Sequence, residues 1–420
     1  MGKPNLKNTL PSLIGLLRLA LKEIGLVKSF QRDNQKTFQP ELEQLTRQNI
    51  SKLSLQELLN RAEHIQNVLK PITYYNILGP IGLEIRKTLF KIPPEWLPNE
   101  ALPEVASMQA LQKIADQLHQ TVAAQTEISS ETLAQEFSSN SSIQQQLTTW
   151  LSNYSYMSEV GTDISVATWG EQPENFQQTL LRMAESSPLT REKFDAQSLN
   201  WQERWRLQQC TQRTVTKGQI SEIYGKLLAD LRWTILAIEA EALKAGALQQ
   251  SGDIFFLEYS EVKHWIQTGI SDGLQQQVQH RRQQFAEDSH RPVPTVVYGN
   301  ILPEPQTLSN QMQASMLTGI PASVGQVEGI VKVCRSFTEA PSGSEKFILV
   351  VPYTDAGWAP LLLNAKAVLA EVGGQLSHGA IIAREYGIPA VMNIENVTTR
   401  LQDGQQVRVN GYRGTVEVLS

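Results

Sequence analysis

The sequence predicts a multidomain protein in which an all-α body is followed by a compact α/β domain. At 420 residues, the chain exceeds what one hydrophobic core usually holds, so two or three domains are expected. Apolar residues recur at helical spacing as far as about residue 290, whereas β-branched residues and turn glycines become frequent later. We therefore expect an N-terminal helical region in 1–100, a second helical domain in 101–288, a proline-rich linker in 289–318 and the α/β domain in 319–420.

Charge and cysteine content exclude several classes of protein. A formal net charge of -5 argues against a dedicated nucleic-acid-binding protein. Cys210 and Cys334 are too few for a disulfide framework and too far apart for a local metal pair, so we expect packing roles in a reducing, cytoplasmic compartment. No Walker loop, HExxH helix or CxxC pair occurs, and the sequence predicts no metal site.

The first predicted element, residues 9–30, raises the question of a membrane. Arg18 and the Lys22-Glu23 pair interrupt its apolar run, which falls short of the roughly 20 residues that a bilayer span needs. It also lacks the small-residue cleavage site of a signal peptide. Because its apolar residues repeat at helical spacing, we expect an amphipathic helix docked on its own domain. The alternative is a helix that contacts a membrane surface.

Helical signals continue through the body. Ser54, with Glu57 three residues later, has the pattern of a capping box. The prolines of residues 91–103 predict a loop between helical parts. Residues 201–246 predict a long helix, or a pair of helices joined near Lys217-Gly218.

The α/β domain is predicted element by element. Residues 325–336 alternate like a strand hairpin, and the short apolar runs at 346–353 and 366–372 predict buried strands. Residues 404–419 predict two more strands across Asn410-Gly411, which is a strong hairpin signal. These elements predict a mixed sheet with short connections.

One histidine, His378, lies where a strand passes into a helix. Gly373-Gly374 predicts the turn, and residues 378–387 read as a helix that ends at its glycine. The first turn of a helix presents free N–H groups and the positive end of the helix dipole, which stabilise a phosphoryl group. A neutral imidazole is a nucleophile near pH 7. Ser377 can cap the helix or donate to a phosphoryl oxygen, although spacing alone also allows His378 a capping or packing role.

The segment GGQLSHGAIIAREYGIPAV, residues 373–391, closely resembles the phosphohistidine segment of the PEP-utilising enzyme family. That family includes phosphoenolpyruvate synthase, pyruvate phosphate dikinase and rifampicin phosphotransferase. The resemblance covers 319–420 and implies a β/β/α swivelling domain in which His378 carries a phosphoryl group. Ala356 stands where the family usually has proline. By the same resemblance and the physics of the turn, the residues that support the phosphate loop are Gly373, Gly374, Ser377, Gly379, Thr354 and Asp355.

The helical part is similar to the rifampicin phosphotransferase group in residues 244–262 and 154–174. There an all-helical domain receives the acceptor substrate, which implies an acceptor region. Two positions depart from the pattern, since Thr162 stands where Glu is expected and Thr168 where Arg is expected. Because the charge pair is missing, the resemblance leaves open whether this region binds an acceptor. The matching residues of the acceptor region are Asp163, Trp169 and Glu171.

The resemblance also implies that a second protein supplies the phosphoryl group. Family enzymes place an ATP-grasp domain ahead of the helical part, whereas this sequence begins with the helical region. We therefore expect no cofactor bound by this chain alone, with ATP and Mg²⁺ supplied through a separate ATP-grasp protein. The expected function is that of a phosphotransferase component that carries a phosphoryl group on His378 from this donor to a small-molecule acceptor. The alternative is a catalytically degenerate member that acts as a binding or regulatory subunit.

Overall fold

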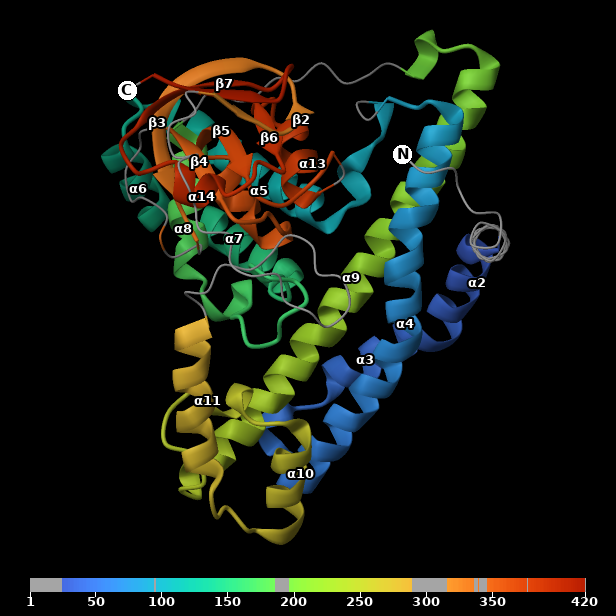
Figure 1. Cartoon of the computed structure of the whole chain (residues 1–420), viewed down its shortest axis with the longest axis vertical. Coiled ribbons are helices and arrows are strands. Elements are labelled where there is room, and N and C mark those ends of the chain that lie inside the picture. Colours follow the sequence, from blue (N-terminus) through green and yellow to red (C-terminus); the bar gives the residue numbers. More distant parts are fainter. Residues whose placement is uncertain are drawn as a thin grey trace, which may run out of the picture.

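The computed structural model confirms a helical body followed by a C-terminal domain built on a mixed sheet (Figure 1). The α/β domain lies beside one end of a long pair of helices, with a group of shorter helices packed against it. The described residues are 25–93, 96–185, 196–288, 316–335, 339, 346–375 and 377–419.

The long pair consists of α4 (Leu55–Phe90) and α9 (Trp201–Lys244), which run side by side in the body. Of the two alternatives for 201–246, the single helix is found, because α9 continues through Lys217-Gly218 without a break. Gly218 is needed there because a Cβ atom would lie 2.0 Å from the carbonyl oxygen of Ala101. The capping box at the start of α4 is confirmed, with the Ser54 amide donating to Glu57 at 2.8 Å.

The remaining helices of the body form two groups. One group packs near α4 and α9: α2 (Leu26–Asp33), α3 (Gln39–Arg47), α10 (Tyr259–Thr268) and α11 (Leu274–Asp288). The other group lies beneath the α/β domain: α5 (Pro103–Ala123), α6 (Ser130–Ser139), α7 (Ser141–Tyr154) and α8 (Glu174–Glu185).

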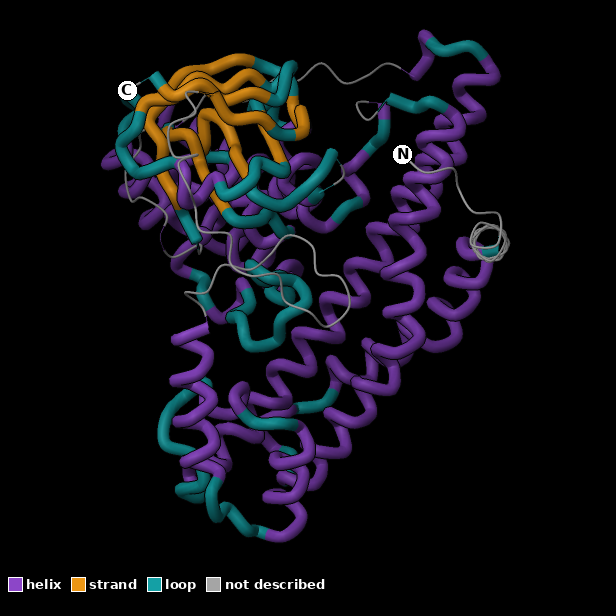
Figure 2. The backbone as a smooth tube through the Cα atoms, in the orientation of Figure 1, coloured by secondary structure: helices purple, strands orange, loops and turns teal. Residues whose placement is uncertain are grey.

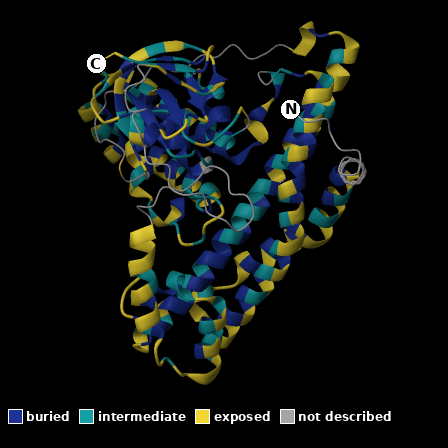
Figure 3. Cartoon of the chain, in the orientation of Figure 1, coloured by how far each residue is buried: buried dark blue, intermediate teal, exposed yellow. Residues whose placement is uncertain are grey.

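One hydrophobic core joins the first group to the long pair. Phe30 of α2, Ile65 of α4, Leu227 of α9 and Trp265 of α10 all belong to it and are buried. The boundary that we expected at residue 100 therefore does not divide this core, since chain segments from both sides of that boundary share it. Figure 3 shows the buried residues continuing along the contact between α4 and α9.

The α/β domain contains one eight-stranded sheet with the order β1-β8-β7-β3-β4-β5-β6-β2. The central strands β3 to β6 run parallel, and antiparallel strands flank them on both sides. Figure 2 shows all of these strands gathered in one part of the molecule. The strands are β1 (Met316–Thr318), β2 (Ile320–Ser323), β3 (Gln326–Val333), β4 (Phe347–Val351), β5 (Ala365–Ala370), β6 (Ala390–Met392), β7 (Gln406–Asn410) and β8 (Thr415–Val418).

Most strand predictions are confirmed, but two differ from the structure. Residues 326–333 form one strand and not a hairpin, because β3 is an inner strand that pairs with β4 on one side and β7 on the other. The last three residues of the predicted linker form β1, which pairs with β8. The other linker residues, 289–315, lie outside the described residues. The hairpin of β7 and β8 is confirmed, with its turn ending at Gly414, where φ is +67°.

The α/β domain and the second helical group share another core. Trp358 is fully buried in it, next to α12 (Ala359–Leu362), and Met108 of α5 and Leu180 of α8 contribute from the body. The loops meet closely, because a Cβ atom on Gly357 would lie 2.1 Å from the carbonyl oxygen of Ser158. The remaining helices of the domain are α13 (His378–Glu385) and α14 (Val397–Arg400). The domain is thus docked on α5 and α8 through α12, and on α5 also through α13.

The described part of the predicted N-terminal helix belongs to the body. Leu26, Val27 and Phe30 of α2 are buried, and the ring of Phe30 lies 5.5 Å from that of Tyr75 on α4. Residues 9–24 of that prediction lie outside the described residues. Among the helices described, none has the length and apolarity needed to cross a membrane.

Candidate active site

His378 is the first residue of α13, as the sequence predicts. It follows the turn after β5, in which Gly373 has a φ of +146°, a value that side chains rarely allow. Gly374 has open space around it, since an added Cβ would meet no atom within 4 Å. Ser377 occupies the N-cap position, but its hydroxyl donates to the Gly374 carbonyl at 2.8 Å and does not cap the helix. The hydroxyl therefore fixes the turn that presents the histidine.

The partner of His378 is a carboxylate from the helical body. Nδ1 of His378 lies 2.7 Å from Oε1 of Glu104, which is 274 residues away in the chain. Glu104 belongs to the first turn of α5 and is 1% exposed, whereas the His378 side chain is 32% exposed. The contact therefore joins the first turns of two helices, one from each part of the protein, at the interface between them.

Burial and charge act against each other in this pair. Burial would raise the pKa of Glu104, but the nearby His378, its hydrogen bond and Lys217 lower it to about 2. Burial would lower the pKa of His378, but the Glu104 carboxylate more than offsets this effect, so that pKa is raised. Burial lowers the pKa of Lys217 on α9, and Glu104 partly restores it. Glu104 is thus held ionised between a histidine and a buried lysine.

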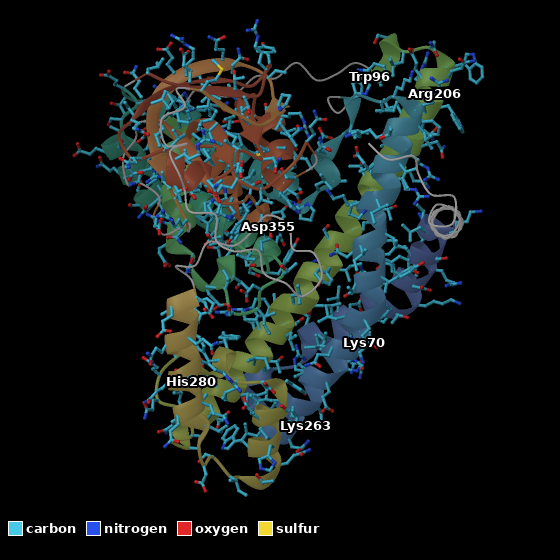
Figure 4. All side chains as sticks on the ribbon, viewed as in Figure 1. Lys70, Trp96, Arg206, Lys263, His280 and Asp355 are labelled. Carbon is cyan, nitrogen blue, oxygen red and sulfur yellow. The ribbon has the colours of Figure 1, made fainter. Side chains whose placement is uncertain are left out.

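The two predicted residues of the preceding loop lie directly beside the histidine. Oδ1 of Asp355 is 3.7 Å from Nε2 of His378, and Oδ2 accepts a hydrogen bond from the Gly161 amide at 3.0 Å. Thr354 packs against Gly379, where an added Cβ would come within 2.5 Å of it. The Thr354 hydroxyl is buried and has no hydrogen-bond partner among the described residues. Figure 4 shows Asp355 at the edge of the α/β domain that faces the body.

A cavity of about 300 Å³ opens from this point into the body. His378, Thr354 and Asp355 contribute its wall on the α/β side, and Tyr156 and Tyr224 are among the lining residues of the body. Its volume is at the lower end of the range for small-molecule sites. Within the described part of the chain, no group of three or more His, Cys, Asp or Glu side chains is arranged to hold a metal ion.

Only one of the three predicted acceptor residues lines the cavity. Asp163 is at its wall, where its Oδ1 accepts from the Ser165 amide at 2.8 Å. Trp169 is 5% exposed and stacks on Trp150, with 5.7 Å between ring centroids, so it belongs to the core. Glu171 makes two hydrogen bonds with Arg232, at 2.8 and 2.7 Å, and accepts another from the Thr168 hydroxyl. Trp169 and Glu171 therefore support the cavity wall from behind.

Comparison with known proteins places the α/β domain in a family. Residues 343–414 match the model of the family described as PEP-utilising enzyme, mobile domain, and this range includes His378. Residues 343–414 form a PEP-utilising enzyme mobile domain. The matched range carries β4 to β7 and α13, so we call the α/β domain, residues 316–419, the mobile domain from here on.

Longer similarities extend into the body. The chain is 35% identical over 198 residues to the rifampicin phosphotransferase of Streptomyces sviceus, and 36% identical over 182 residues to that of Bacillus cereus. These alignments cover 44% and 43% of this chain, and 21% of each relative. The phosphoenolpyruvate synthase of Aeropyrum pernix is 43% identical over 102 residues, which is 24% of this chain and 12% of that protein. The chain thus matches about a fifth of the length of its rifampicin phosphotransferase relatives.

Proposed function

We propose that this chain transfers a phosphoryl group from Nε2 of His378 to a small-molecule acceptor bound in the cavity. The observation that carries the proposal is the position of His378 at the cavity wall, with Nδ1 bonded to the buried Glu104. The phosphoryl group is on Nε2 in this proposal because Nδ1 is bonded to Glu104 in the docked state, which leaves Nε2 as the ring nitrogen that can carry it. The matches to rifampicin phosphotransferases and a phosphoenolpyruvate synthase support the same chemistry.

The donor in this proposal is a separate ATP-grasp protein, in the cytoplasm, that uses ATP and Mg²⁺. An imidazolium is not a nucleophile, and Glu104 raises the pKa of His378 while the mobile domain is docked. A mobile domain that leaves the body loses Glu104, so the histidine returns toward its ordinary pKa of 6.5 and can accept a phosphoryl group. His378 can therefore accept the phosphoryl group while the mobile domain is away from the body and pass it on when the domain is docked.

Delivery uses the contacts of the docked state. Glu104 accepts the Nδ1–H hydrogen bond of the phosphorylated histidine and so holds the ring in one orientation. The acceptor hydroxyl attacks phosphorus, the P–N bond breaks, and its electron pair remains on Nε2. The hydroxyl proton passes to Asp355, whose Oδ1 lies 3.7 Å from Nε2, or to water. The products are a phosphate ester and a neutral imidazole.

Mass spectrometry of the protein isolated from its own cells under alkaline conditions tests this proposal. We expect an acid-labile phosphoryl group on the peptide that contains His378, and none at that position in the His378→Gln variant. His280→Gln is the matched control, because His280 is exposed on α11, far along the chain from the cavity residues. An unmodified His378 in repeated preparations, also after incubation with ATP, Mg²⁺ and cell extract, would contradict the proposal.

A second candidate function is a binding or regulatory subunit in which His378 only docks the mobile domain. The departures at Thr162 and Thr168 favour it, because Glu171 forms its ion pair with Arg232 and receives only uncharged hydrogen bonds from Thr168. In that case His378→Gln would release the mobile domain from the body although no phosphoryl group is ever found on His378. The presence or absence of the phosphoryl group on His378 separates the two candidates, and hydrogen exchange of α13 in the same samples measures the docking role.

A further inference from the structure

The described wall of the cavity offers an acceptor little positive charge. Arg232 is the only lysine or arginine in this wall, and the other group that can be cationic, His378, is paired with the Glu104 carboxylate. Its guanidinium donates twice to Glu171, at 2.8 and 2.7 Å, and once to the Ile164 carbonyl at 2.7 Å. Two of these bonds form a bidentate pair with a carboxylate, which neutralises the arginine. An incoming carboxylate would have to compete with Glu171 for it.

Negative charge is present at several points of the same wall. Glu104, Asp163 and Asp355 all line the cavity. Burial raises the pKa of the Tyr353 hydroxyl, and the negative charges of Glu159, Asp355 and Asp163 raise this pKa further. These three carboxylates are therefore close enough to Tyr353 to affect its ionisation. Lys217 lies close to Glu104 but is not among the residues that line this cavity. The phosphoryl group on His378 would add more negative charge next to Asp355.

Apolar and aromatic side chains form another part of the wall. Tyr156, Tyr224 and Tyr353 present three rings, and Leu228 is among the aliphatic side chains between them. Ring faces of this kind pack against flat apolar groups and attract cations. A volume of about 300 Å³ accommodates a compact molecule.

We propose that the acceptor is a compact, ring-bearing alcohol that is uncharged or cationic, and not a carboxylate such as pyruvate. This inference rests on the proposed function, because it names the substrate class of the same site. Thr162 and Thr168 stand at the wall where the resemblance leads one to expect a Glu-Arg pair, so neither position adds charge to the cavity. The reaction converts phosphohistidine and the alcohol into a phosphate ester and histidine, with the hydroxyl proton released.

Three probes with the same ring and one hydroxyl group test the charge preference. They are 3-phenylpropan-1-ol, which is neutral, phenylalaninol, which is cationic, and 3-phenyllactate, which is anionic; pyruvate is the fourth probe. Binding to the full-length, unmodified chain is measured first by ligand-observed NMR. We expect the neutral or the cationic probe to bind at least about tenfold more tightly than phenyllactate. Equal binding, or tighter binding of phenyllactate or pyruvate, would overturn the inference.

Transfer is measured in a second arm. Potassium phosphoramidate passes its phosphoryl group to imidazole nitrogen with loss of ammonia. It can reach His378, whose side chain is 32% exposed, and reacts with the molecules in which this imidazole is neutral. After removal of the reagent, loss of the phosphoryl group from the His378 peptide is followed with each probe. We expect faster loss, with formation of the phosphate ester, with phenylpropanol or phenylalaninol only. A loaded protein that is discharged by pyruvate or phenyllactate, or by none of the probes, contradicts the inference.

The two proposals fail in different ways. If His378 is never loaded in cells or by phosphoramidate, the proposed function fails, whereas the binding arm still decides the charge preference of the cavity. A variant with an added positive charge makes the binding measurement more specific. Thr162 lies at the cavity wall, so Thr162→Lys is expected to improve phenyllactate binding by about tenfold, whereas Gln145→Lys on the exposed face of α7 is expected to leave it unchanged. An unchanged charge preference in Thr162→Lys would contradict the electrostatic argument.

Discussion

Replacing Glu104 by glutamine removes the charge that links the body to the mobile domain while keeping the shape of the side chain. The pKa of Glu104 falls from the ordinary 4.5 to about 2, which corresponds to roughly 3 kcal/mol in favour of the ionised form at neutral pH. Because this pKa is lowered on folding, the contribution is present above pH 4.5 and is lost as the pH falls toward 2. Lys217 of the body causes part of the shift, so at pH 7 the Glu104→Gln variant should lose at most roughly 3 kcal/mol of docking free energy.

The loss should appear where the two parts meet. Hydrogen exchange in α13 and in the first turn of α5 reports how often the mobile domain opens, and a loss of at most roughly 3 kcal/mol corresponds to exchange that is faster by up to about a hundredfold. NMR titration of His378 should also show a lower pKa in the variant. Glu131→Gln is the matched control, because Glu131 is a first-turn acid of α6 that is exposed, and such a residue contributes about 0.3–1 kcal/mol. Exchange in α13 that changes no more than in the control would refute the reasoning.

Three further outcomes are expected. The pKa of His378 is raised on docking, so its contribution is complete below pH 6.5 and is lost as the pH rises through the higher value, and the free energy of opening of α13 should fall over that range. Gly379→Ala should lower thermal stability by about 1–3 kcal/mol because its Cβ meets Thr354 at 2.5 Å, whereas Gly374→Ala, with nothing within 4 Å, should stay within about 0.5 kcal/mol. Lys217→Met should raise the pKa of Glu104 above about 2, measured by carboxyl NMR, because it removes a nearby positive charge. A Gly379→Ala variant as stable as the unsubstituted protein would contradict the packing argument. A free energy of opening that does not fall as the pH rises through the His378 pKa, or a Glu104 pKa that does not rise in Lys217→Met, would contradict the electrostatic argument.

Local signals in the sequence predict much of the fold. The capping box of Ser54 and Glu57 and the glycine end of α13 depend on neighbouring residues, so they can be identified without knowledge of the tertiary structure. The alternation in 326–333 is equally visible, but whether it belongs to a hairpin or to one inner strand depends on β4 and β7. The break considered near Gly218 is a similar case, since the glycine serves the close approach of Ala101 and not a turn.

The candidate site was predictable only where its residues belong to a local sequence pattern. His378, Thr354 and Asp355 lie in short segments with a specific pattern, and the structure brings them together. Glu104 carries no such signal, because an acid in the first turn of a helix is common in helices generally. Its role arises only when α5 and α13 meet. Trp169 shows the opposite error, since a matched position proves to be a core residue.

The loop formed by residues 158–163 serves both parts of the protein at once. Its Ser158 carbonyl fits against Gly357, its Gly161 amide donates to Asp355, and Ser158, Gly161, Thr162 and Asp163 also line the cavity. The enclosed site therefore exists only while the mobile domain is present, because one of its walls travels with the histidine. In the proposed function, departure of the domain would open the site for exchange of product and acceptor, and its return would shield the phosphoryl group from water during transfer. In that function, one movement would both deliver the phosphoryl group and close the cavity in which it reacts.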